Sequence, residues 1–386
     1  MFRRQKREPV DRCVVCGREY YPLSSILPVC PDCIRERFDK CKDVIYRAHE
    51  ISRSRFRLPY PQPNASNGIR CIFCARECSL SRGDIGYCGL TIVDEDGKLR
   101  RIAGNGKWGL LDWYYDPLPT NCVAEWFCPA STGIGYPKYS VSERGPEIGY
   151  YNLAVFYGSC NLDCLYCQNW QYREYHLNLS SKLVHVDELV RAADSERVTC
   201  VCYFGGDPSS QIVHALVASK KMFENAKKKG RVFRICWETN GQISPIFLRQ
   251  VIELSLRSGG IVKVDIKAGT GNMYKALTDG EYSNVLRTIR EVAKRVKERP
   301  EIPLLTISLL VVPGYVDHVE IENVCKLINE LGVDIPLSLL AFHPDYLMSD
   351  LPPTSRRHMD LALRIAREYG IEMVNVGNKW LLGDYY

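Results

Sequence analysis

The stretch LAVFYGSCNLDCLYCQNW, residues 153–170, decides the fold and the chemistry of this chain. It begins as an apolar run that predicts a β-strand and continues into a loop with three cysteines, Cys160, Cys164 and Cys167. Three residues separate the first two cysteines and two separate the last two. A structural zinc site would have two pairs of cysteines and a closed tetrahedron. Three thiolates on one loop instead indicate a cubic iron–sulfur cluster with one iron left open to a substrate or cosubstrate.

Further strand-like runs follow the first one, and amphipathic helical patterns separate them. The runs are RVTCVCYF (197–204), RVFRICWE (231–238), IVKVDIK (261–267), LLTISLLVV (304–312), LSLLAFH (337–343) and EMVNV (372–376). This alternation predicts an α/β fold with a parallel sheet and right-handed crossovers. Six or seven units favour a partial parallel (β/α)6–7 barrel over residues 151–386, although the spacing alone leaves an open doubly wound sheet as an alternative.

Unusual polar residues stand where these strands end, which is where a parallel barrel carries its chemistry. The sequence GGDP (205–208) follows the second strand, ETNG (238–241) ends the third, and His343 ends the sixth. Each has an ordinary alternative: a tight turn for the glycine pair, a helix cap for the Asp-Pro step, and a structural role for the histidine. The hypothesis of a site rests on all of them meeting at one barrel mouth.

The fourth strand carries a charged stripe. Lys263, Asp265 and Lys267 alternate with valine and isoleucine, so we expect their side chains to point into a polar barrel lumen. Three cysteines inside strands have apolar and aromatic neighbours, and we interpret them as core residues: Cys200, Cys202 and Cys236.

The chain has 18 cysteines, and most of them fall in tight clusters. No signal peptide is apparent, so we read the clusters as metal ligands in a reducing cytoplasm. Residues 1–50 form a zinc-ribbon-like module in this interpretation, followed by a linker at 51–70 that is rich in Pro, Ser and Asn. Cys41 is left over and is expected to be buried. The predicted zinc ligands are Cys13, Cys16, Cys30 and Cys33.

Residues 71–150 form a cysteine-rich segment that looks irregular, with many Gly, Pro and Tyr residues over 104–150. Its first part has four cysteines that could surround a zinc ion or an auxiliary iron–sulfur cluster, the alternative being reduced structural cysteines. These four are Cys71, Cys74, Cys78 and Cys88. Cys122 and Cys128 either complete a metal site or merely pack.

The formal net charge is +6, and no apolar run reaches the length of a membrane span. Basic runs at Arg3–Arg7 and Lys227–Lys229 indicate a solvated surface or contact with RNA or another acidic partner.

The chain resembles the radical S-adenosylmethionine (SAM) superfamily, and within it the pyruvate formate-lyase activating enzyme-like proteins of the AmmeMemoRadiSam type. The motifs GSCNLDCLYCQNW, ETNG, VDIKA, VVPGYVD, FHPDYLMSDLPPT and VGN occur in the order of that group, after a four-cysteine box. The resemblance covers about residues 70–380. It departs from the family pattern at Asp207, where Glu is usual, at Glu238, where Asp is frequent, over 113–150, and in the extra N-terminal module.

The resemblance implies a role for each matching residue. Cys160, Cys164 and Cys167 would hold a 4Fe–4S cluster whose open iron binds SAM, with Tyr166 at the aromatic position before the last cysteine. The implied SAM contacts are Gly205, Gly206, Asp207 with its carboxylate on the SAM ammonium, Asn240, Asp265, Lys267, and His343 near the nucleoside.

The resemblance also implies an oxidoreductase-like reaction. A flavodoxin- or ferredoxin-type donor would supply one electron, SAM would be cleaved to methionine and a 5′-deoxyadenosyl radical, and the radical would abstract hydrogen from a substrate. We expect a protein substrate, as for the glycyl-radical activases. The alternatives are an RNA-modifying enzyme and a non-catalytic iron–sulfur protein.

Overall fold

The computed structural model describes residues 8–386, apart from the side chains at positions 180 and 181. The basic run Arg3–Arg7 lies outside the described residues. No helix in the described part of the chain is long and apolar enough to cross a membrane.

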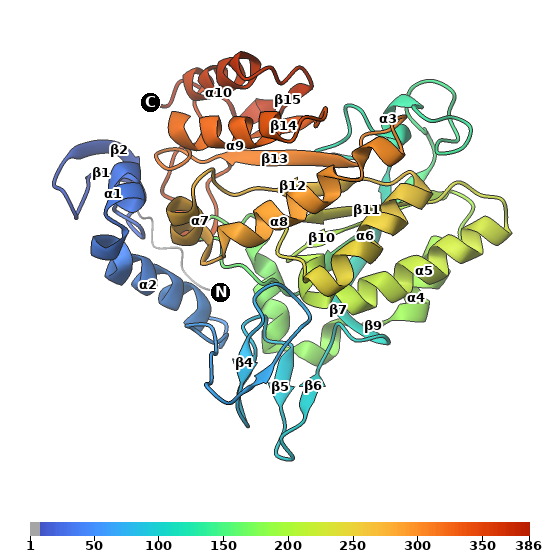
Figure 1. Cartoon of the computed structure of the whole chain (residues 1–386), viewed down its shortest axis with the longest axis horizontal. Helices are drawn as coiled ribbons and strands as arrows, with labels where there is room; N and C mark the ends of the chain where they lie inside the picture. Colours follow the sequence, from blue (N-terminus) through green and yellow to red (C-terminus); the bar gives the residue numbers. More distant parts are fainter. Residues whose placement is uncertain (1–7) are drawn as a thin grey trace.

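The centre of the fold is a nine-stranded sheet with the order β15-β14-β13-β12-β11-β10-β8-β7-β9 (Figure 1). Neighbouring strands from β8 to β15 pair in parallel, which confirms the predicted α/β partial barrel. Most of these strands are buried on both faces, as parallel strands covered by helices are. They are β8 (Tyr151–Tyr157), β10 (Val198–Gly205), β11 (Arg234–Thr239), β12 (Val262–Asp265), β13 (Leu305–Val311), β14 (Leu337–Ala341) and β15 (Val374–Gly377).

Helices connect the parallel strands and pack side by side along the sheet (Figure 1). Helix α6 shows how the sequence sets their limits, because Pro245 begins it and Gly259, with φ of +80°, ends it. The helices are α4 (Val186–Ala193), α5 (Ile212–Lys228), α6 (Pro245–Ser258), α7 (Gly271–Thr278), α8 (Tyr282–Ala293), α9 (His318–Glu330) and α10 (Arg356–Glu368).

The expectation of an irregular segment before the barrel is wrong for one long stretch. Strand β7 (Trp108–Pro117) pairs antiparallel with β8 and extends the sheet, and the short β9 (Leu183–His185) pairs antiparallel with β7. The tryptophans and tyrosines of WGLLDWYYDP favour an extended strand, while most glycines and prolines lie outside it.

The rest of the cysteine-rich segment has only short elements, and β4, β5 and β6 lie together at one end of the molecule, far from α3 (Figure 1). Leu80, Tyr87 and Val93 form a small separate core there with Cys71 and Cys78. The elements are β3 (Ile69–Arg70), β4 (Ser79–Leu80), β5 (Thr91–Val93), β6 (Leu99–Arg101) and, farther along, α3 (Pro129–Thr132).

The N-terminal segment packs directly on the barrel. Buried Leu23, Leu27 and Ile34 belong to the same core cluster as the barrel strands, and Tyr315 Oη accepts from the backbone N–H of Ser24 at 2.9 Å. The elements are β1 (Val10–Arg12), β2 (Glu19–Leu23), α1 (Pro31–Glu36) and α2 (Phe38–Ser54). Helix α2 continues past residue 50, so no break in structure marks the predicted end of the module there.

Candidate functional site

The three cysteines of the loop after β8 line one cavity of about 170 Å³ at the C-terminal ends of the parallel strands. Cys160 and Cys164 are buried and Cys167 is half-buried. The backbone N–H of Leu162 donates to Cys160 Sγ at 3.3 Å, which curls the loop around that sulfur. The lining also includes Tyr166, Gly205, Gly206, Asp207, Thr239, Asn240, Asp265, Lys267, Leu310 and Leu340. Most of the predicted site residues therefore do meet.

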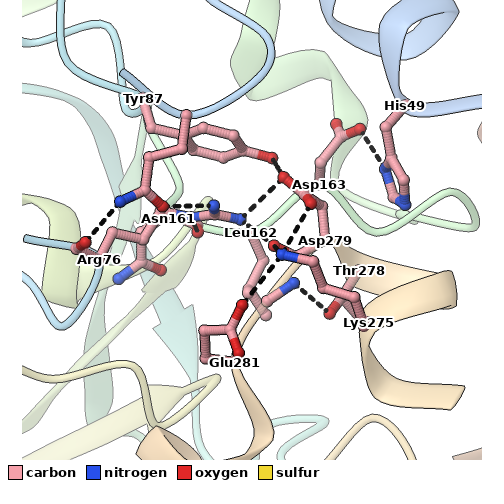
Figure 2. Close-up of polar contacts among 12 residues, drawn as sticks. His49, Arg76, Tyr87, Asn161, Leu162, Asp163, Lys275, Thr278, Asp279 and Glu281 are labelled. Atoms are coloured by element: carbon pink, nitrogen blue, oxygen red, sulfur yellow. Dashed lines mark hydrogen bonds and ion pairs between the residues drawn. The ribbon is translucent and has the colours of Figure 1, made fainter. Parts of the chain in front are cut away.

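A buried charge network around Asp163 fixes the cysteine loop, and Figure 2 shows its contact with His49. The carboxylate of Asp163 contacts His49 Nδ1 at 2.8 Å, accepts from Ser52 Oγ at 2.6 Å, and pairs with Arg173. The side chains of His49, Asp163 and Arg173 are fully buried. Burial alone would raise the pKa of Asp163, but the charge of Arg173 and the hydrogen bond with His49 hold it well below its usual range.

A second branch of the network ties the loop to the cysteine-rich segment (Figure 2). The guanidinium of Arg76 donates to the carbonyl of Asn161 and to Asp279, and Tyr87 Oη donates to Asp279 Oδ2 at 2.8 Å. The Arg76 guanidinium also stacks on the Tyr87 ring, 3.4 Å from its centroid. On the barrel side, the N–H of Asp163 donates to the carbonyl of Thr278 at 2.8 Å. Three separate parts of the chain thus fix the cysteine loop.

The GGDP turn needs both of its glycines. Gly205 has φ of +98°, and a Cβ at Gly206 would lie 2.2 Å from the carbonyl oxygen of Ser159. The N–H of Asp207 donates to that same carbonyl at 2.8 Å. The absence of side chains lets the turn pack against the start of the cysteine loop.

The Asp207 carboxylate is already engaged by protein donors. It accepts from the N–H of Ser209 at 2.8 Å, from Thr239 Oγ1 at 3.1 Å and from the N–H of Asn240 at 2.6 Å, and burial raises its pKa. These bonds join the end of β10 to the end of β11. Asp207 therefore positions the loop at Thr239 and Asn240, and its predicted contact with the SAM ammonium stays a prediction.

Asn240 reaches the cysteine loop directly. Its Nδ2 donates to Cys160 Sγ at 3.5 Å and to Asn161 Oδ1 at 2.9 Å. Hydrogen bonds to a ligating sulfur raise the reduction potential of an iron–sulfur cluster, so Asn240 is placed to tune one held by this loop.

The charged stripe of β12 points into the lumen as predicted, with Asp265 and Lys267 lining this cavity and Lys263 lining a second one. Lys267 Nζ pairs with Asp265 Oδ2, while Asp265 Oδ1 is buried without a hydrogen-bond partner among the described residues. Tyr166 Oη, in the same lining, also lacks one within that part of the chain. An unpartnered buried acceptor and donor call for a polar ligand, and SAM offers both kinds of group. The residues present therefore fit an iron–sulfur cluster on the three thiolates with SAM beside it.

His343 is not brought into this lining. Its side chain is 54% exposed, and Nδ1 lies 3.7 Å from Asp345 Oδ2. It follows β14 as expected, but its role near the nucleoside stays a prediction.

The two four-cysteine sets upstream of the barrel, at 13–33 and 71–88, differ in how closely their sulfur atoms lie. The sulfur atoms of Cys13, Cys16, Cys30 and Cys33 all lie within 4.8 Å of one another, close enough to bind a single tetrahedral ion. In residues 8–386, no other group of three or more metal-ligating side chains meets that limit. The buried set at 71–88, namely Cys71, Cys74, Cys78 and Cys88, is therefore more widely spaced than one ion requires.

A second and larger cavity, of about 690 Å³, adjoins the first and shares Asn169, Phe204, Glu238 and Leu340 with it. Cys200, Cys202 and Cys236 are largely buried but also line this cavity, so the interpretation as simple core residues is incomplete. Cys122 and Cys128 line it too.

Residue patterns did not predict which residues form the network around Asp163. His49 lies 114 positions from Asp163 in the chain, and Arg76 lies 203 positions from Asp279. An aspartate between two cysteines of the motif was the one signal present, since an acidic side chain beside thiolate ligands needs a cation to offset its charge.

Several known proteins are similar to this chain. Residues 154–328 match the family described as the Radical SAM superfamily. An uncharacterized protein of Methanocaldococcus jannaschii is 26% identical over 320 residues, which are 81% of this chain and 82% of that protein. A solved domain of a pyruvate-formate lyase-activating enzyme from Bacteroides vulgatus is 16% identical, covering 42% of this chain and 94% of that one, with a TM-score of 0.34. A radical SAM methyltransferase from Sphaerobacter thermophilus is 16% identical, covering 59% and 66%, with a TM-score of 0.42. The stretch that matches the radical SAM superfamily, residues 154–328, therefore contains the three-cysteine loop and the other strand ends that line the cavity up to Leu310.

Proposed function

We propose that this protein is an enzyme that cleaves SAM reductively and abstracts hydrogen from a protein substrate. The observation that carries the proposal is the single cavity that joins Cys160, Cys164 and Cys167 to the unpartnered polar atoms of Asp265 and Tyr166. A 4Fe–4S cluster and SAM, which the superfamily implies, would supply the 5′-deoxyadenosyl radical there. The electron would come from a flavodoxin- or ferredoxin-type donor.

The residues that line the SAM cavity would bind the cluster and orient SAM beside it. The thiolates of Cys160, Cys164 and Cys167 would hold the cluster, and Asn240 would donate to the sulfur of Cys160. Asp265 Oδ1 would accept from a donor group of SAM, while Lys267 pairs with Oδ2 of the same carboxylate. The glycines of the GGDP turn leave room for close approach of the backbone.

The larger cavity supports a macromolecular substrate. It adjoins the SAM cavity and extends to Trp380, which is 72% exposed, so a side chain carried on a flexible loop could enter from the surface.

The second proposal for this chain concerns the N-terminal module: the close spacing of its four sulfurs, Cys13, Cys16, Cys30 and Cys33, supports a structural zinc ion.

Deuterium transfer tests the substrate class. The reconstituted protein would be incubated anaerobically with SAM and dithionite, together with the protein or the RNA fraction of cells grown on deuterated medium. We expect deuterium in 5′-deoxyadenosine from the protein fraction only. Deuterium from the RNA fraction would support the RNA-modifying alternative, and no 5′-deoxyadenosine in either reaction would support a non-catalytic iron–sulfur protein.

A further inference from the structure

Five cysteines line the larger cavity of the barrel, apart from the three that line the SAM cavity. They come from three different segments of the chain that lie far apart in sequence. Cys122 and Cys128 belong to the loop after β7, Cys200 and Cys202 to β10, and Cys236 to β11. Thiols are the side chains that ligate iron–sulfur clusters and soft metal ions, so their convergence on one cavity calls for an explanation.

The strand cysteines share one face of the sheet. Cys200 and Cys202 are two positions apart on β10 and therefore point the same way. Cys202 is the register partner of Cys236 on the neighbouring parallel strand, which places their Cα atoms about 5 Å apart. Cys122 approaches from the loop, because its sulfur and that of Cys202 both contact Lys263 Nζ, at 3.0 and 2.9 Å.

A buried cation faces two of these sulfur atoms. Lys263 is 2% exposed, and an ammonium can only donate hydrogen bonds, so the two sulfurs must act as acceptors. The carboxylate of Glu238 lies farther from Nζ, at 3.4 Å, and is partly exposed. The other buried cation in the lining, Arg234, is already paired with Glu147 at 2.7 Å. Thiolates bound to iron would place further negative charge beside the Lys263 ammonium, which already pairs with Glu238.

The spacing of the sulfurs argues for a cluster rather than a single ion. Four thiolates on one zinc ion lie about 3.8 Å apart, given a Zn–S distance of about 2.3 Å. Within the part of the chain that the structure describes, only the four N-terminal cysteines come together closely enough for that. No three of the lumen thiols meet that limit together, and neither do the three of the SAM loop, so a cluster with several irons suits both sets better than a single ion does.

We infer that the barrel lumen holds a second iron–sulfur cluster, ligated by up to four thiolates from the set Cys122, Cys128, Cys200, Cys202 and Cys236. The two cavities share lining residues, so a substrate in the larger cavity would lie between the two clusters. The inference concerns metal content and holds whichever substrate the enzyme takes.

Metal analysis of cysteine variants tests this inference. The full-length protein would be reconstituted anaerobically with iron and sulfide, and iron, sulfide and zinc would be counted per chain. The test variant is Cys202→Ala/Cys236→Ala, and the matched control is Cys325→Ala, which removes a buried thiol of α9 that lines neither cavity. We expect the test variant to lose about two to four irons with matching sulfide, and the control to lose none.

A second background separates this cluster from the SAM cluster. The triple variant Cys160→Ala/Cys164→Ala/Cys167→Ala should keep the lumen iron, and adding Cys202→Ala/Cys236→Ala should remove it. If the strand variant does not fold, Cys122→Ala/Cys128→Ala gives the same test from the loop, outside the strands. Iron content equal to that of Cys325→Ala, or zinc in place of iron at the lumen thiols, would overturn the inference.

Discussion

Replacement of Asp163 by asparagine probes the network that fixes the cysteine loop. The substitution keeps the shape of the side chain but leaves the guanidinium of Arg173 buried without its carboxylate partner. Arg173 is poorly placed to compensate, since its Nε and Nη2 already lack hydrogen-bond partners among the described residues. Breaking a fully buried ion pair from one side costs about 3–5 kcal/mol, so we expect the free energy of unfolding to fall by about that amount.

Urea unfolding followed by far-UV circular dichroism measures this loss. The matched control is Glu291→Gln, which breaks an exposed ion pair with Lys294 and should cost about 0–1 kcal/mol. The double variant Asp163→Asn/Arg173→Met removes both charges and should recover much of the stability. If Asp163→Asn costs no more than Glu291→Gln, the reasoning about the network is wrong.

Further predictions concern the SAM cavity and the buried side chain of His214. Gly206→Ala would place a Cβ 2.2 Å from a backbone carbonyl oxygen, and relieving this clash should cost about 1–3 kcal/mol. We therefore expect calorimetry to show SAM binding that is about tenfold weaker. Gly106→Ala, where the added Cβ meets open space, should leave SAM binding unchanged. Asn240→Ala removes the donor to the sulfur of Cys160, and we expect a lower midpoint potential in an anaerobic EPR titration, whereas an unchanged potential would exclude a tuning role. Burial lowers the pKa of His214 to about 4, so the unfolded chain takes up this proton first and stability falls as the pH drops from about 6.5 to 4. The free energy of unfolding should therefore fall less between pH 7 and pH 5 in His214→Gln than in the wild type, by about 2 kcal/mol. An equal fall in the variant and the wild type would count against this explanation.

The sequence predicted those parts of the site that depend on local order along the chain. The cysteine spacing, the strand ends and the period-two stripe at Lys263, Asp265 and Lys267 all follow from one short segment each, and the structure brings them to adjoining cavities. The same period of two could have placed Cys200 and Cys202 in the lumen. Their apolar neighbours pointed to a core position instead, because burial and cavity lining look alike in sequence.

Local sequence patterns did not predict the contacts between segments that lie far apart in the chain. The bond between His49 and Asp163 depends on how α2 packs against the cysteine loop, which no local signal encodes. Strand β7 was missed for a related reason, since its pairing with β8 fixes it as a strand although the surrounding sequence is rich in turn residues. The place of His343 after β14 was predicted as well, but its side chain is half-exposed and is not part of the cavity lining, so its role near the nucleoside stays a prediction.

We propose that the thiolates of Cys160, Cys164 and Cys167 hold the cluster at which this protein cleaves SAM. The most direct measurement compares the yield of 5′-deoxyadenosine from SAM and dithionite in the reconstituted wild type and in Cys160→Ala/Cys164→Ala/Cys167→Ala. We predict product from the wild type and none above background from the triple variant, with Cys325→Ala matching the wild type. Equal yields in the wild type and the triple variant would contradict the claim.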